Sequence, residues 1–150
     1  MNYDNISLLI PTPSNILKIE QIRYNAYSKK VADEELKNTY YAQKLLSQEI
    51  ICFIYTYHDE VVAGCYVSSD FNSLYVEQLF VLKKYQEVGL HLGQKLLSSI
   101  IENKNFVEHY FNKEFTYTKI SPCDPKSNKI YKKMGYRLIH KSLNIFGKKI

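Results

Sequence analysis

Three segments rich in β-branched and aromatic residues follow one another between residues 49 and 82, and they constrain the fold more than any other feature of the chain. They cover residues 49–57 (EIICFIYTY), 61–67 (VVAGCYV) and 74–82 (LYVEQLFVL). Residues of these types favour strands. The turns between the segments are too short for a crossover connection, which parallel neighbours would need. We therefore expect three consecutive antiparallel strands.

Helical patterns surround this meander. A short strand at 6–10 precedes a helix capped by Ser14 or Asn15 and running to about Lys29, and a second helix covers 33–47. After the meander we expect a helix from about Leu92, a strand at 115–121, a short helix at 127–134 ended by Gly135, and strands at 136–143 and 145–150. This order predicts one α/β (α+β) domain over residues 1–150. Its mixed, mostly antiparallel sheet would be flanked by about four helices.

The composition excludes several classes of protein. With 45% hydrophobic and 23% charged residues, the chain is typical of a globular protein. Its N-terminal apolar run at 6–10 is too short for a signal peptide or a membrane span, so we expect a soluble, cytoplasmic protein with reduced cysteines and no membrane partner. The lysines are scattered and only Arg23 and Arg137 are arginine, which argues against a nucleic-acid partner. The histidines lack metal-ligand spacing, so we expect no metal site.

The segment that indicates chemistry most directly is residues 81–97 (VLKKYQEVGLHLGQKLL), where a strand runs into a glycine-containing loop and then a helix. Unpaired N–H groups and the helix dipole at a helix start bind anions such as phosphate, and Gly89 allows a close backbone approach. One glycine between a strand and a helix is also common where no phosphate binds. The loop alone therefore leaves both interpretations open.

The same segment resembles the signature of the GNAT acetyltransferase superfamily. Val81, Tyr85, Gln86 and Gly89 match it in one register, and His91 stands where the family has Gly or Ala. A second register, two residues further along, fits the run Leu92-Gly93-x-x-Leu96-Leu97. Late in the chain, residues 128–136 (NKIYKKMGY) are similar to the family's Asn-x-x-Phe/Tyr-Tyr-x-x-x-Gly-Phe/Tyr region. The resemblance covers residues from about 49 to 136.

The resemblance implies the GNAT fold, in which the central strands, here 74–82 and 115–121, splay apart to admit acetyl-CoA. It also implies which residues hold this co-substrate. Asn128 and the end of the strand at 79–82 would bind the pantetheine arm, and one of the two loop registers would bind the pyrophosphate. The candidate acetyl-CoA ligands are Leu79, Phe80, Val81, Gln86, Glu87, Val88, Gly89, Leu90, His91, Gly93, Asn128 and Tyr131.

The resemblance implies two catalytic residues. Glu77 stands where many family members carry a glutamate that accepts the amine's proton, directly or through water, and its neighbour Gln78 is expected on the opposite face of the strand. Tyr131 would protonate the departing thiolate, since a phenol, which titrates near about 10, keeps its proton at neutral pH. The N–H of Phe80 or Val81 would polarise the thioester carbonyl. A paired structural carboxylate and a packing tyrosine are the respective alternatives.

The implied function is direct transfer of the acetyl group of acetyl-CoA to a primary amine of a small molecule. The candidate acceptor-binding residues are Tyr24, Tyr27, Tyr40, Tyr41 and Cys123, whose aromatic members suit an amine. Cys123 has no recognisable histidine partner, which indicates a bystander. Two alternatives stay open: a GNAT acting on protein or RNA-linked amines, and a non-catalytic acyl-CoA sensor. A homodimer is also left open.

Overall fold

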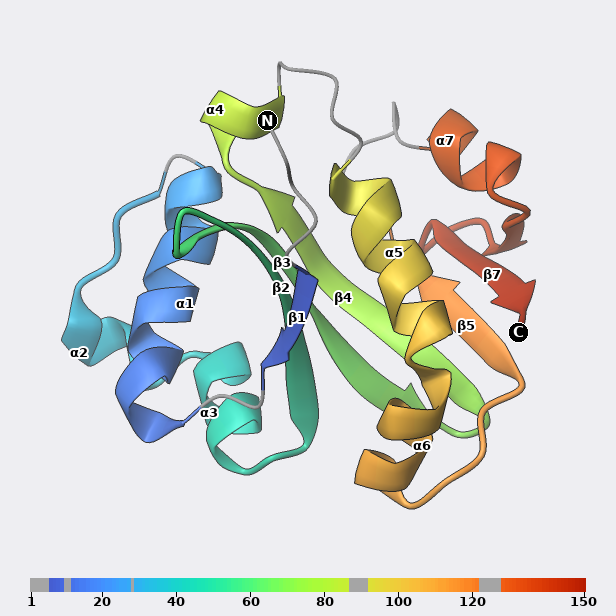
Figure 1. Ribbon diagram of the computed structural model, residues 1–150, viewed down its shortest axis with the longest axis horizontal. Coiled ribbons are helices and arrows are strands. Elements are labelled where there is room, and N and C mark those ends of the chain that lie inside the picture. The colour runs from blue at the N-terminus through green and yellow to red at the C-terminus, as the bar shows by residue number, and fades with distance from the viewer. Residues whose placement is uncertain (1–5, 10–11, 28, 87–91, 122–127) are drawn as a thin grey trace.

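The computed structural model shows one mixed sheet, whose described part has seven strands in the order β1-β2-β3-β4-β5-β7-β6 (Figure 1). The structure describes residues 6–9, 12–27, 29–86, 92–121 and 128–150. β4 pairs with β5 in parallel, and the other neighbouring strands pair antiparallel. The strands are β1 (Ile6–Leu9), β2 (Ile50–Tyr57), β3 (Glu60–Asp70), β4 (Ser73–Val81), β5 (Tyr117–Ile120), β6 (Arg137–His140) and β7 (Ile145–Lys149). The mixed, mostly antiparallel sheet predicted from the sequence is confirmed.

Helices cover both faces of the sheet. The first three pack on one face, and α5 and α6 cover the other (Figure 1). The short α4 and the start of α5 lie near the end of β4, at the top of Figure 1, and α7 lies at the upper right, above β7. The helices are α1 (Pro13–Ala26), α2 (Asp33–Leu36), α3 (Tyr40–Leu46), α4 (Lys83–Gln86), α5 (Leu92–Glu102), α6 (Lys104–Phe111) and α7 (Asn128–Lys133).

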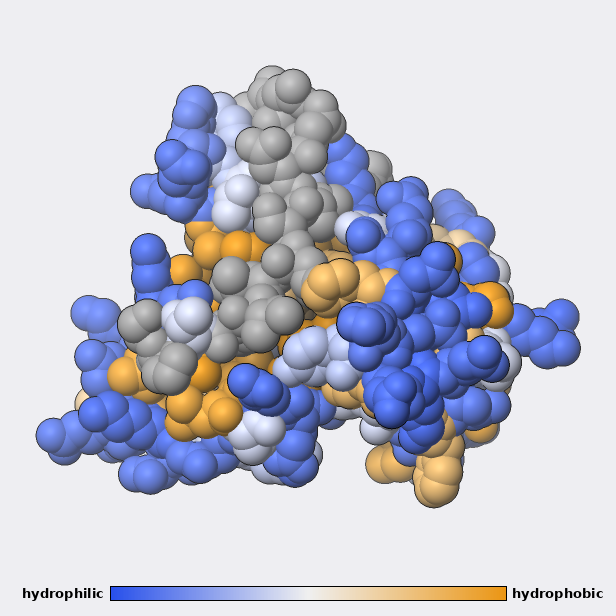
Figure 2. Space-filling model, turned by 60° about the horizontal axis from the view of Figure 1, so that its bottom comes forward, coloured by the Kyte–Doolittle hydropathy of each residue, from blue (hydrophilic) through white to orange (hydrophobic). Residues whose placement is uncertain are grey.

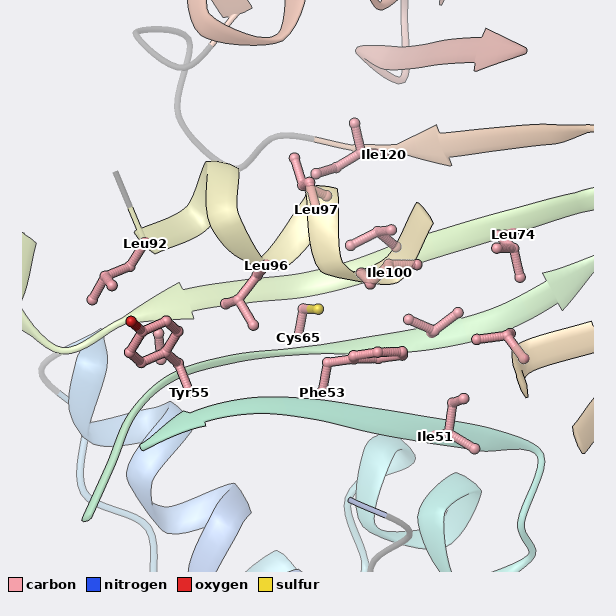
Figure 3. Close-up of a cluster of buried hydrophobic side chains, with 14 of the residues drawn as sticks. Ile51, Phe53, Tyr55, Cys65, Leu74, Leu92, Leu96, Leu97, Ile100 and Ile120 are labelled. Atoms are coloured by element: carbon pink, nitrogen blue, oxygen red, sulfur yellow. The ribbon is translucent and has the colours of Figure 1, made fainter. Parts of the chain in front are cut away.

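The two faces of the sheet contribute to two separate hydrophobic cores. Along β2, Ile51, Phe53 and Tyr55 face α5, whereas Ile50, Cys52 and Ile54 face α1 and α3. This alternation explains why the whole strand is apolar, because both of its faces are covered. Figure 3 shows Leu96, Leu97 and Ile100 of α5 projecting onto the strands of the larger core.

The helical segments are more numerous than the four expected, for local reasons. The helix expected at 33–47 is broken in two, because the side chain of Thr39 accepts a hydrogen bond from the amide of Ala42 and so caps a new helix at α3. α1 begins at Pro13, after Thr12 in an extended conformation, rather than at Ser14 or Asn15. The segment after α5 forms the separate helix α6, and residues 83–86 form one helical turn rather than a loop.

The pairing of β4 changes halfway along the strand. Among the described residues, β4 pairs with β5 only at Ser73–Val76, opposite Tyr117–Ile120, whereas its pairing with β3 continues as far as Val81. Residues 77–81 of β4 therefore form an edge, called here the open edge, that β5 does not cover. This end of the pairing agrees with the splay between the central strands that the resemblance implied.

One face of the surface combines hydrophobic and hydrophilic regions (Figure 2). On the face seen in Figure 2, hydrophobic side chains gather near the middle and hydrophilic ones dominate the periphery. In the part of the chain that the structure describes, no helix is long and apolar enough to span a membrane.

Candidate active site

The open edge presents a defined set of backbone groups. The amide of Leu82 donates to the carbonyl of Val62 at 2.9 Å, and Phe80 lies opposite Gly64 in the same ladder. Because backbone groups alternate in direction along a strand, those of Phe80 face β3, whereas those of Leu79 and Val81 face the open edge. Of the two amides considered for polarising a carbonyl, that of Val81 is the one directed at the open edge.

Two side chains reach the carbonyls of this edge. The hydroxyl of Tyr27, just after α1, donates to the carbonyl of Leu79 at 2.9 Å. The side-chain amide of Gln86, in α4, donates to the carbonyl of Val81. Tyr27 and Gln86, named from the sequence for different roles, therefore lie at one place in the fold, beside the end of β4.

A β-bulge at Gln78 overturns one prediction. The sequence placed Gln78 on the opposite face from Glu77, but both side chains hydrogen-bond the hydroxyl of Tyr41 and therefore lie on the α3 side of the sheet. The register slips between Gly64 and Tyr66, which pair with Phe80 and Glu77 respectively. Gln78 has a φ of 52°, and the extra residue inserted by a bulge breaks the strict alternation of a strand.

Glu77 is half-buried and accepts hydrogen bonds on both carboxylate oxygens. The hydroxyl of Ser68, on β3, lies 2.9 Å from Oε2, and that of Tyr41 lies 3.5 Å from Oε1. Burial raises the pKa of Glu77 above its ordinary value, and these two hydrogen bonds oppose that change. A carboxylate with a raised pKa and a partly exposed position suits a general base.

Behind Glu77 lies a buried ion pair. Glu20 is fully buried, and the guanidinium of Arg23 grips it through Nε at 2.8 Å and Nη2 at 3.0 Å. The hydroxyl of Tyr66 also donates to Glu20. The third guanidinium nitrogen, Nη1, donates to Oε1 of Gln78 at 3.0 Å. The ion pair is thereby connected to the residue next to Glu77.

Sequence reasoning missed the roles of Glu20, Arg23 and Ser68. Arg23 carries a usable signal, because it occupies an apolar position in the helical pattern of α1, and a charge at a buried position requires a partner. Glu20, three residues before it on the same helix, is the obvious candidate. Ser68 gives no such signal, since a serine on a strand is commonly exposed.

The start of α5 packs closely on β4. A Cβ built on Gly93 would lie 3.3 Å from Cδ2 of Leu79, so glycine lets the first turn of the helix approach the strand. Exposed Lys83 and Lys84 stand on α4, where their charge attracts phosphate. The remaining loop candidates, residues 87–91 (Glu87, Val88, Gly89, Leu90 and His91), lie outside the described residues.

Tyr131 lies on the other side of the sheet from Glu77. Its buried ring packs near Tyr136 and Phe146, with ring centroids 6.0 and 6.3 Å away. It belongs to the core beneath α5, whereas Glu77 faces α3. Asn128, at the start of α7, exchanges side-chain hydrogen bonds of 3.5 Å with Asn144. These bonds connect α7 to the C-terminal hairpin. The two predicted catalytic residues, Tyr131 and Glu77, lie on opposite faces of the sheet.

The predicted acceptor-binding tyrosines are brought together in part. The ring of Tyr24 lies 4.5 Å from the guanidinium carbon of Arg23, and that of Tyr41 lies 5.1 Å from the same atom. Tyr27 lies at the open edge, as described above, and Tyr40 is largely exposed. Cys123 lies outside the described residues.

Metal binding and a nucleophilic cysteine are the two other kinds of chemistry to consider in the described part of the chain. Among those residues, no group of three or more histidine, cysteine or acidic side chains has an arrangement that would hold a metal ion. Cys52 and Cys65 are buried free thiols, and burial raises the pKa of Cys65 to about 12. Since the thiolate is the nucleophilic form, these cysteines are chemically inert at neutral pH.

Comparison with known proteins identifies the family. The model of the acetyltransferase (GNAT) family matches residues 16–136, which is most of the chain. The chain therefore belongs to the GNAT acetyltransferase family and is an acyltransferase. No curated protein sequence matches it.

Solved structures share the fold at low sequence identity. An acetyltransferase from Thermus thermophilus aligns over 100% of both chains, with a TM-score of 0.74 and 12% identity. The ribosomal-protein-S18-alanine N-acetyltransferase of Escherichia coli gives a TM-score of 0.67 at 14% identity, over 97% of this chain and 93% of that one. The PaiA N-acetyltransferase of Thermoplasma acidophilum, solved in complex with coenzyme A, gives 0.63 at 15% identity, over 97% and 99%.

Proposed function

We propose that this protein transfers the acetyl group of acetyl-CoA directly to a primary amine of a small molecule at the open edge of β4. The observation that carries the proposal is the end of the pairing between β4 and β5 after Val76, at the point where Glu77 begins the open edge. An amide-rich arm such as pantetheine pairs with an open strand edge as an added strand would. The family membership of the chain supports acetyl-CoA as the co-substrate.

The described residues fit this co-substrate. The Val81 amide is directed at the open edge, Gly93 lets α5 start close to β4, and exposed Lys83 and Lys84 stand on α4, beside the loop that leads to α5. Positive charge and a helix start favour the phosphates. In the proposed arrangement the loop at 86–93 binds the pyrophosphate, and Leu79, Phe80, Val81 and Asn128 contact the pantetheine arm.

Acetyl-CoA supplies the activated acetyl thioester. Glu77 accepts the proton of the attacking amine, directly or through water, as the new C–N bond forms. The N–H of Val81 stabilises the negative charge that develops on the carbonyl oxygen. In this arrangement the thioester lies at the open edge, between the two faces of the sheet, with Glu77 on one side and Tyr131 on the other. Tyr131 delivers a proton to the sulfur as the C–S bond breaks, so that coenzyme A leaves as a neutral thiol.

The residues around Glu77 support a cationic small molecule as the acceptor. Tyr41 hydrogen-bonds Glu77, Tyr27 lies at the open edge, and Tyr24 packs against Arg23. Aromatic rings of this kind attract ammonium groups. The buried guanidinium of Arg23 is neutralised by Glu20 at 2.8 Å, so it does not repel an incoming amine. The carboxylate of Glu77 then provides the attraction.

A panel of acceptors assayed by mass spectrometry tests the function. Acetyl-CoA is incubated with small primary amines in one arm and with peptides bearing a free N-terminal amine in another. Acetylation of a small amine, lost in Glu77→Gln, is the expected result. Acetylation of peptides alone would replace the proposed acceptor class. Coenzyme A binding without any acetylated product would indicate a sensor.

A further inference from the structure

A continuous chain of hydrogen bonds runs from the buried ion pair on α1 to Glu77 on β4. Arg23 Nη1 donates to Gln78 Oε1 at 3.0 Å, Gln78 Nε2 donates to Tyr41 Oη at 3.1 Å, and Tyr41 Oη lies 3.5 Å from Glu77 Oε1. Three elements, α1, β4 and α3, therefore contribute to one path. We call the residues Arg23, Gln78 and Tyr41 the relay.

The chemistry of the first member determines the direction of every bond in the relay. A guanidinium is only a donor, so Gln78 must present its carbonyl oxygen to Arg23 and its NH₂ group to Tyr41. The Tyr41 oxygen accepts that bond, which leaves its single proton available to point toward Glu77. The relay thus delivers a hydrogen-bond donor to one oxygen of the carboxylate, while Ser68 delivers a donor to the other.

The ion pair holds the origin of the relay in place. All three guanidinium nitrogens of Arg23 are used: Nε and Nη2 bind Glu20, and Nη1 binds Gln78. The side chain of Arg23 is 7% exposed and that of Glu20 is 0% exposed, so water does not replace either side chain as the hydrogen-bond partner of the other. A lysine has one nitrogen and cannot bind both partners in this way.

The β-bulge places the side chain of Gln78 on the same face of the sheet as Arg23 and Tyr41. In a regular strand its side chain would face α5, away from Arg23 and Tyr41. Its φ of 52° is unfavourable for a residue other than glycine, asparagine or aspartate, and the two side-chain hydrogen bonds offset that cost. This is a backbone distortion located beside the proposed base.

We propose that Arg23, held by Glu20, is a positioning residue that acts through Gln78 and Tyr41 to keep a hydrogen-bond donor on Glu77. The proposal rests on the function proposed above, in which Glu77 is the base, and adds the residues that control it. Arg23 touches neither co-substrate nor amine in this scheme. Its effect is to hold Glu77 in one orientation and to favour its ionised form.

Other titratable groups also face Glu77 and are taken into account. α3 contributes a lysine and a tyrosine, β3 an aspartate, and β4 a second tyrosine, while the arginine of α1 acts through the relay. These groups are Lys44, Tyr41, Asp70, Tyr75 and Arg23. Asp70 is paired with Lys119 at 2.9 Å, and burial raises the pKa of Tyr41 to about 12. Tyr41 therefore remains a donor through the pH range in which Glu77 titrates.

The test uses Tyr41→Phe and Gln78→Met, which remove a relay group while conserving most of the volume. Tyr110→Phe is the matched control, since it removes one tyrosine hydroxyl bonded to the distant carbonyl of Gln48. The titration of the Glu77 carboxyl is followed by carbon-13 NMR, with the signal assigned through Glu77→Gln. The pH dependence of kcat/KM is measured with an amine from the panel, and melting curves confirm that each variant is folded.

The relay predicts a graded result. Tyr41→Phe raises the midpoint of the Glu77 titration by about one pH unit, since a hydrogen bond to a charged group is lost. Gln78→Met shifts it in the same direction by less, and Tyr110→Phe leaves it unchanged. Arg23→Lys, where folded, matches Gln78→Met, and combining the two adds nothing further. The acid limb of kcat/KM moves with the midpoint.

Two outcomes separate the relay from the proposed function. A folded Gln78→Met protein whose Glu77 titrates as in the parent overturns the relay. A titration that shifts as expected, while the acid limb of kcat/KM stays in place, supports the relay and overturns Glu77 as the base. The NMR titration needs no turnover, so it decides the relay even if no acceptor amine is found.

Discussion

The substitution Arg23→Met tests the buried ion pair most sharply. It removes the cation beside Glu20 and replaces it with an apolar side chain of comparable length. Glu20 is fully buried and receives two hydrogen bonds from Arg23, at 2.8 and 3.0 Å. In the variant, its carboxylate keeps the hydroxyl of Tyr66 but has no counter-charge. We expect a large loss of stability.

The size of the loss follows from the geometry. Removing one partner of a buried ion pair costs about 3–5 kcal/mol, because the other charge is left uncompensated. For a domain of this length each kcal/mol lowers Tm by about 2–4 °C, so we expect a drop on the order of 10 °C or more. Lys119→Met is the control, since its partner Asp70 is 40% exposed, and such pairs contribute less than about 1 kcal/mol.

Urea unfolding followed by fluorescence of the tyrosines gives the free energies. Adding Glu20→Gln is expected to recover part of the loss, since the amide carbonyl still accepts from Tyr66. A loss of stability no larger than that of Lys119→Met would refute this account of the ion pair.

Three further predictions concern packing and chemistry. Gly64→Ala is expected to cost about 1–3 kcal/mol in urea unfolding, because its Cβ would lie 2.8 Å from Cζ of Phe80 and 3.1 Å from the carbonyl oxygen of Phe53. Gly93→Ala is expected to cost less, because its Cβ would meet most closely the flexible end of Leu79, at 3.3 Å, and equal costs would contradict this packing. Val81→Pro removes the N–H directed at the open edge without breaking the ladder to β3, and kcat is expected to fall on the order of 10²-fold, so full turnover in a folded variant would exclude this amide. Tyr131→Phe is expected to lower kcat by a similar order, while Tm and acetyl-CoA affinity barely change. The control Tyr136→Phe, which alters the neighbouring ring, is expected to leave kcat unchanged, and a Tyr131→Phe protein with lower stability but normal turnover would mean that Tyr131 only packs.

Much of the fold follows from local patterns in the sequence. The three strands at 49–82 are predicted because their side chains are β-branched or aromatic on both faces, and the structure buries both faces. The end of α7 is predicted by Gly135, whose φ of +94° is a conformation that glycine adopts without strain. These features depend on neighbouring residues alone, so a single sequence carries them.

The features that were missed depend on contacts between distant residues. The bulge at Gln78 is stabilised by Arg23, 55 positions away, and no residue near 78 signals a positive φ. The strict alternation of a strand therefore put Gln78 on the wrong face. The break before α3 has a local cause in Thr39, but threonine also occurs inside helices, so the capping role becomes clear only from its bond to Ala42.

The central claim is that the open edge of β4 and the start of α5 bind acetyl-CoA, and calorimetric titration tests it most directly. We expect one molecule of acetyl-CoA to bind per chain in roughly the micromolar range, more weakly as salt screens the phosphates. We expect acetyl-pantetheine, which lacks the pyrophosphate, to bind more weakly still. Heat that is absent at saturating acetyl-CoA, together with an unchanged Tm, would contradict the claim.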